Sequence, residues 1–138
     1  MILYIHARLF SAKYIVDLQM LVVSLLKILV IFLLLDSVYL YFAKSIFGEM
    51  IVRIQRVAMQ VRWWSAAVVY AFMTILLYWF IIKDRRPVWE ATLLGLATYG
   101  IYDFTNYATL KNYDLSVAIM DTVWGATLFT LTTWILRF

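Results

Sequence analysis

Four long apolar segments dominate this chain of 138 residues. They cover residues 21–42, 65–82, 88–108 and 117–136, and each is close to the length of about 20 residues that an α-helix needs to cross a bilayer. Inside hydrocarbon every backbone amide needs a partner within the protein, and an α-helix supplies that partner locally. The pattern predicts an all-α integral membrane protein with four transmembrane helices.

Composition supports the membrane class and limits the chemistry. The chain is 66% hydrophobic and only 14% charged, whereas soluble domains carry about 25% charged residues. It contains no cysteine, which excludes disulfides, thiolate metal sites and cysteine nucleophiles. The net charge of +4 favours attraction to anionic lipid and does not indicate nucleic-acid binding.

The chain ahead of the first span is interrupted by polar residues. Residues 1–20 include Arg8 and Asp17 among apolar positions, too many polar groups for a clean span. We expect an N-terminal extension or an interfacial segment there, followed by a transmembrane domain over 21–138. Met20 is an alternative start site.

A basic segment, residues 44–64, separates the first two spans. Its apolar residues recur at three- and four-residue spacing, and its charged residues include Arg53, Arg56 and Arg62. This periodicity predicts a basic amphipathic interfacial helix that lies in the membrane plane or docks on a partner protein. A connector helix resting on lipid headgroups is the simpler reading. We therefore assign the three arginines to partner or headgroup contact.

Three aspartates interrupt the apolar spans: Asp36, Asp103 and Asp121. An ionised carboxylate in hydrocarbon costs about 2.5–3.5 kcal/mol on insertion scales, so such residues normally face a bundle interior. With four consecutive crossings, the first and third spans end at the membrane face where the fourth begins. By helical rise the three acids then lie about 6 to 9 Å below that face. We expect them to share one pocket.

Polar and small residues follow these acids at helical spacing. Tyr, Asn and Trp side chains in the third and fourth spans can donate hydrogen bonds to carboxylates, and Gly95 and Gly125 would permit close helix packing. The candidate buried polar or ligand site comprises Asp36, Tyr99, Tyr102, Asp103, Asn106, Asp121 and Trp124.

The acidic cluster has three interpretations. The first is a fully hydrogen-bonded polar network that fixes helix register, the second is a proton or cation site, and the third is a site for a lipid headgroup or polar substrate. Three acids close together are not all ionised without compensation. Either some are protonated, or Lys44, Lys111 or a bound cation balances their charge.

Motifs for catalysis are missing. His6 is the single histidine and lies outside the spans, which argues against a Ser-His-Asp triad. The sequence contains no nucleophile elbow, zinc-protease pattern or glycine-rich phosphate loop. We expect no enzymatic activity, no cofactor and no metal site, and an aspartyl dyad is the catalytic arrangement that the residues leave open.

Short motifs surround the acids of the third and fourth spans. Residues 102–106 read Tyr-Asp-Phe-Thr-Asn, residues 108–110 read Ala-Thr-Leu, and residues 121–125 read Asp-Thr-Val-Trp-Gly. With the Leu-Asp pair at residues 35–36, they resemble a family of uncharacterised four-helix bacterial membrane proteins whose core reads Tyr-Asp-Leu-Thr-Asn, Ala-Thr-Leu and Asp-x-x-Trp-Gly. The resemblance runs from about residue 21 to the end. It implies four spans and a common site for the aspartates, and it brings no activity.

The chain departs from the bacterial pattern in its first half. Tyr39 stands where the family usually has Trp, and the leader of residues 1–20 and the basic connector are additional. With these departures the chain resembles a eukaryotic or large-DNA-virus relative of the family more than a typical bacterial member.

Together these features predict a small multipass membrane protein that acts as a non-catalytic anchor or structural subunit of a larger membrane-associated assembly. Expected partners are the bilayer, anionic lipid in particular, other proteins of that assembly and further copies of the chain. A viral relative would place the assembly at an inner virion membrane tied to a capsid. The alternative function is a proton- or cation-coupled carrier, or a lipid-headgroup binder, that uses the aspartate cluster.

Overall fold

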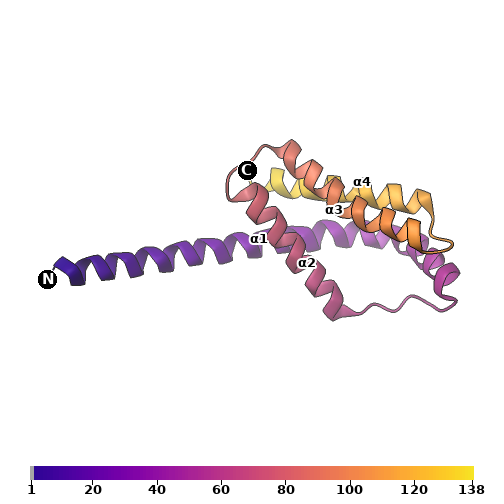
Figure 1. Ribbon diagram of the computed structural model, residues 1–138, viewed down its shortest axis with the longest axis horizontal. Helices are drawn as coiled ribbons and strands as arrows, with labels where there is room; N and C mark the ends of the chain where they lie inside the picture. Colours follow the sequence, from indigo (N-terminus) through magenta and orange to yellow (C-terminus); the bar gives the residue numbers. More distant parts are fainter. Residues whose placement is uncertain (1) are drawn as a thin grey trace.

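The computed structural model describes residues 2–138, with side chains from residue 13 onward. These residues are helical without any strand, which confirms the all-α class. The elements, shown in Figure 1, are α1 (Ile2–Gln55), α2 (Trp63–Leu77), its π-helical continuation η1 (Tyr78–Ile82), α3 (Val88–Thr109) and α4 (Leu115–Ile135).

Three helices of the described chain are long and apolar enough to cross a membrane. They cover Lys13–Gln55, Trp63–Ile82 and Leu115–Ile135. The fourth helix, α3, has 22 residues but is not among them, because its polar residues, Glu90 and Asp103 included, lower its hydropathy. The membrane character is confirmed, whereas the predicted count of four transmembrane helices is not.

Helix α1 is a single rod of 54 residues, about 80 Å long by helical rise. Its C-terminal half packs in the bundle, and its N-terminal half projects away from the other helices (Figure 1). The boundary expected near residue 20 is therefore not a break in the helix. From residue 13 this projecting part exposes apolar side chains, among them Tyr14, Ile15, Val16 and Leu18. The side chains of residues 1–12, His6 included, lie outside the described part of the structure.

The separate amphipathic helix predicted over residues 44–64 is not confirmed. Helix α1 continues to Gln55, and residues 56–62 form an irregular connector before α2. Arg56, with a φ of 61°, adopts the left-handed conformation that commonly ends a helix. The apolar periodicity has a different cause, since Met50 is 1% exposed and its sulfur lies 3.5 Å from the backbone nitrogen of Asp114. Part of this segment thus packs on the protein.

Helices α3 and α4 run antiparallel and make the most extensive helix contact of the bundle (Figure 1). They approach closely at two glycines, because a Cβ added to Gly95 would lie 2.8 Å from the carbonyl carbon of Gly125. Helix α1 packs beside this pair, with the Phe32 and Phe129 ring centroids 5.1 Å apart. The bundle therefore places the middle of α1, which carries Asp36, next to α4, which carries Asp121.

Candidate functional site: a buried aspartate network

Asp36 connects three helices. It lies in α1 and is 7% exposed. Its carboxylate accepts a hydrogen bond from Nε1 of Trp124 in α4, at 2.7 Å, and a second from the hydroxyl of Tyr70 in α2. Two donors from separate helices therefore compensate for the loss of water around this acid.

Asp121 joins the same network through an aromatic pair. It is half-buried in α4, and its Oδ1 accepts a hydrogen bond of 2.9 Å from the hydroxyl of Tyr39. The Tyr39 ring stacks on Trp124, with centroids 4.5 Å apart and ring planes 9° from parallel. Because Trp124 also donates to Asp36, the stacked pair links the two acids.

Asp103, in α3, is fully buried. Its carboxylate accepts a hydrogen bond of 2.9 Å from the Tyr113 hydroxyl and a longer one of 3.5 Å from Thr122, the neighbour of Asp121. Tyr113 belongs to the turn between α3 and α4, outside the predicted spans. Burial, and then the hydrogen bond to Asp103, raise the pKa of the Tyr113 phenol above its usual value. The phenol therefore stays protonated and remains a donor at neutral pH.

The stacked Tyr39–Trp124 pair links Asp36 to Asp121, whereas Asp103 accepts separate hydrogen bonds from Tyr113 and Thr122. Each carboxylate has its own neutral donors, drawn from tyrosine, tryptophan and threonine. The ammonium group of Lys44 lies 4.8 Å from the centroid of the Tyr41 ring, and Lys111 is exposed, so neither supplies the expected compensation by direct contact. Among the residues that the structure describes, no three acidic or histidine side chains are arranged to hold a metal ion.

Two tyrosines of the predicted site form no hydrogen bond with the acids among the described residues. Tyr102 is 65% exposed, because it directly precedes the buried Asp103 and so points about 100° away around the helix. The structure thereby corrects its assignment to a buried site. Tyr99 is half-buried and packs over Gly125, and its hydroxyl faces the Met73 sulfur at 3.9 Å. Asn106 is half-buried and has no recorded hydrogen bond to the acids within the described residues.

Four donors of the network were not predicted: Tyr39, Tyr70, Tyr113 and Thr122. Tyr39 follows Asp36 by three residues, so helical spacing alone could have placed it on the same face. Tyr70 is one of several polar-tipped residues in a span without charged residues, which is a weaker signal. Tyr113 lies in a turn, where no periodicity predicts its direction.

The three arginines assigned to partner or headgroup contact have different surroundings. Arg53 forms an ion pair with Asp114 at the start of α4, which uses its charge within the chain. Arg56 and Arg62 are exposed at the two ends of the irregular connector. All three arginines are exposed, and their assignment to partner or headgroup contact stays a prediction.

A family model described as a predicted membrane protein (DUF2177) matches residues 21–137. The match begins within α1 and includes α2, α3, α4 and every residue of the aspartate network. No curated protein and no solved structure matches the chain. The resemblance to an uncharacterised membrane protein family is confirmed over this range, whereas the specific motif and the viral relation stay predictions.

Proposed function

The chain belongs to the predicted membrane protein family DUF2177 over residues 21–137, and we propose that it is a non-catalytic anchor or structural subunit of a larger membrane-associated assembly. The observation that supports this proposal is the aspartate network. Asp36 and Asp121 are joined across α1, α2 and α4 by hydrogen bonds and by the Tyr39–Trp124 stack, and Asp103 accepts its own bonds from Tyr113 and Thr122. Such a network favours one helix register over others, which suits a rigid support better than a substrate site.

Two parts of the molecule extend beyond the packed bundle and are available to partners. One is the projecting part of α1, with apolar side chains such as Val16 and Leu18. The other is the connector over residues 56–62, with its exposed arginines. The bundle has little mass outside its helices, so a protein partner would contact these two parts, while lipid or further copies of the chain would contact the spans.

Photo-crosslinking in the native membrane tests the anchor role. A photoreactive phenylalanine analogue at Val16 is expected to form discrete protein adducts, because this position is 51% exposed on the projecting part of α1. The matched control is Leu34, which is 64% exposed on the same helix but beside the bundle and should yield mainly lipid adducts. Lipid adducts alone at both positions would contradict the proposal.

A second candidate function, a proton- or cation-coupled carrier, is favoured by the state of Asp121. This acid is only half-buried, and its one recorded hydrogen bond engages a single carboxylate oxygen. A carrier would move protons or cations across the membrane of proteoliposomes, and Asp121→Asn would abolish this flux. The control Asp17→Asn changes an exposed acid of α1 and should keep the flux. Flux no greater than in protein-free liposomes would exclude this function.

A further inference from the structure

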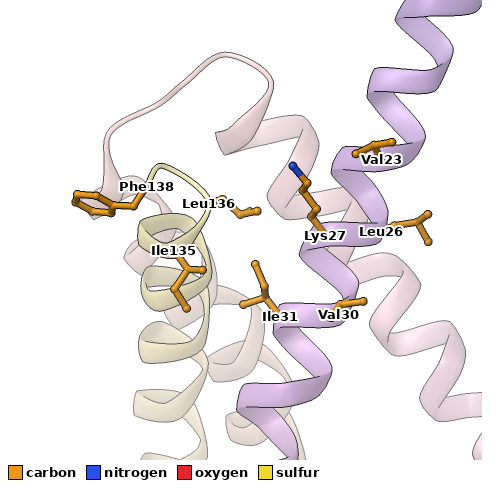
Figure 2. A pocket seen from close by; sticks show the side chains of 8 residues that line it. All are labelled: Val23, Leu26, Lys27, Val30, Ile31, Ile135, Leu136 and Phe138. Carbon is orange, nitrogen blue, oxygen red and sulfur yellow. The ribbon is translucent and has the colours of Figure 1, made fainter.

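Lys27 faces an apolar groove at the end of the bundle away from the aspartate network. The groove lies between α1 and the end of α4 and has a volume of about 530 Å³. Its walls are mainly aliphatic, with Val30 and Ile31 from α1 and Ile135 from α4. Figure 2 shows the Lys27 side chain reaching into the space between these two helices.

Lys27 forms no ion pair among the residues whose side chains the structure describes. It is exposed, and residues 1–12 contain no acidic residue. An ammonium group in an apolar segment is costly unless it reaches the membrane interface or an anion. Helix α4 ends beside it at Ile135, and Arg137 follows. Lys27 is therefore level with a helix end, where lipid phosphates are within reach.

The surroundings of the groove carry an excess of positive charge. Arg137 donates a hydrogen bond to the backbone carbonyl of Arg86, which joins the chain end to the turn before α3. Arg86 pairs with Glu90 at 2.9 Å, and the Lys83 ammonium lies 3.9 Å from the Trp79 ring centroid. Basic residues outnumber acidic residues by five to two at this end of the bundle. The basic residues are Lys27, Lys83, Arg85, Arg86 and Arg137, and the acidic residues are Asp84 and Glu90.

We propose that this groove binds an anionic phospholipid, with the phosphate on Lys27 and an acyl chain along Val30, Ile31 and Ile135. The volume is within the range of about 300–1,000 Å³ of small-ligand sites, which suffices for part of one chain. An aliphatic wall beside a single unpaired cation matches an amphiphile with a negative head. The site is independent of the proposed anchor role and of the aspartate network.

Native mass spectrometry of the purified full chain tests this site. The protein in detergent is titrated with dioleoyl phosphatidylglycerol or with dioleoyl phosphatidylcholine, and the bound lipid is counted. We expect tighter binding of phosphatidylglycerol, and a loss of about fivefold in its affinity in Lys27→Gln, because one basic residue near a membrane contributes about 1 kcal/mol of attraction to anionic lipid. Lys27→Arg should keep the preference.

The matched control is Lys44→Gln, which removes an exposed lysine of the same helix outside the groove and should leave the phosphatidylglycerol affinity unchanged. Competition with inorganic phosphate tests whether the site binds a whole lipid or a free anion. We expect inorganic phosphate not to displace phosphatidylglycerol. Equal binding of the two lipids, an unchanged affinity in Lys27→Gln, or displacement by phosphate would overturn the proposal. So would crosslinking of Lys27 to an acidic protein partner in the native membrane.

Discussion

Replacing Gly125 with alanine is expected to lower the free energy of unfolding by about 1–3 kcal/mol, the usual cost of overpacking a tight contact. The added Cβ would lie 2.6 Å from the Cβ of Tyr99. That atom is fixed to the α3 backbone, so no side-chain rotation relieves the clash. Helices α3 and α4 would have to separate, although their contact is the most extensive in the bundle.

Gly48→Ala is the matched control, because nothing lies within 4 Å of a Cβ built at Gly48. This helical position should accept alanine without loss, since alanine has the higher helix propensity. Unfolding of both variants in mixed micelles, followed by tryptophan fluorescence, measures the difference. Equal stability of the two variants would show that the glycine contact between α3 and α4 is looser than described.

Asp36→Ala is expected to cost about 1–3 kcal/mol, because it leaves the donors of Tyr70 and Trp124 without their acceptor. Asp36→Asn keeps a carbonyl oxygen as an acceptor and should cost less. The same unfolding measurement applies to both variants. An equal loss in the two variants would mean that the negative charge, which both remove, matters more than the acceptor oxygen that Asp36→Asn keeps.

Asp17→Ala serves as the control on the same helix, since Asp17 is exposed on the projecting part of α1 and its loss should change stability by less than about 0.5 kcal/mol. A double-mutant cycle of Asp36→Ala with Trp124→Phe isolates the bond between the two side chains. Additive effects of the two substitutions would contradict the hydrogen bond seen at 2.7 Å.

The network also bears on the choice between the proposed functions. A carrier needs an acid that exchanges its ligand, whereas a structural bundle needs acids with permanent donors. Asp36 and Asp103 each accept bonds from two side chains, and Asp121 accepts one. Any transport role would therefore depend on Asp121 first, and the single substitution Asp121→Asn distinguishes the two functions.

Helical class and approximate helix positions followed from the sequence. Long apolar segments over residues 65–82 and 117–136 became α2 with η1 and α4, because backbone hydrogen bonds in a helix are local and the apolar length is read directly from the chain. Spacing and topology also singled out the three acids and the small residues Gly95 and Gly125 as candidates.

Boundaries were predicted less well, for a physical reason. The polar residues before Met20 and after Phe42 suggested ends of a span, but a helix tolerates polar residues where they face water or headgroups. Helix α1 accordingly passes through both positions and ends only at Gln55. The periodicity over residues 44–55 arises from packing on the turn near Asp114, a contact that requires the fold.

By itself the sequence determined that this chain forms apolar helices and that three of their acids must be satisfied inside the protein. The tertiary structure alone decided which groups satisfy them: Tyr39, Tyr70 and Tyr113 donate, whereas Tyr102 faces outward. Helical periodicity fixes the direction of a side chain around its own axis. It carries no information on which neighbouring helix, or which residue of a turn, will lie opposite.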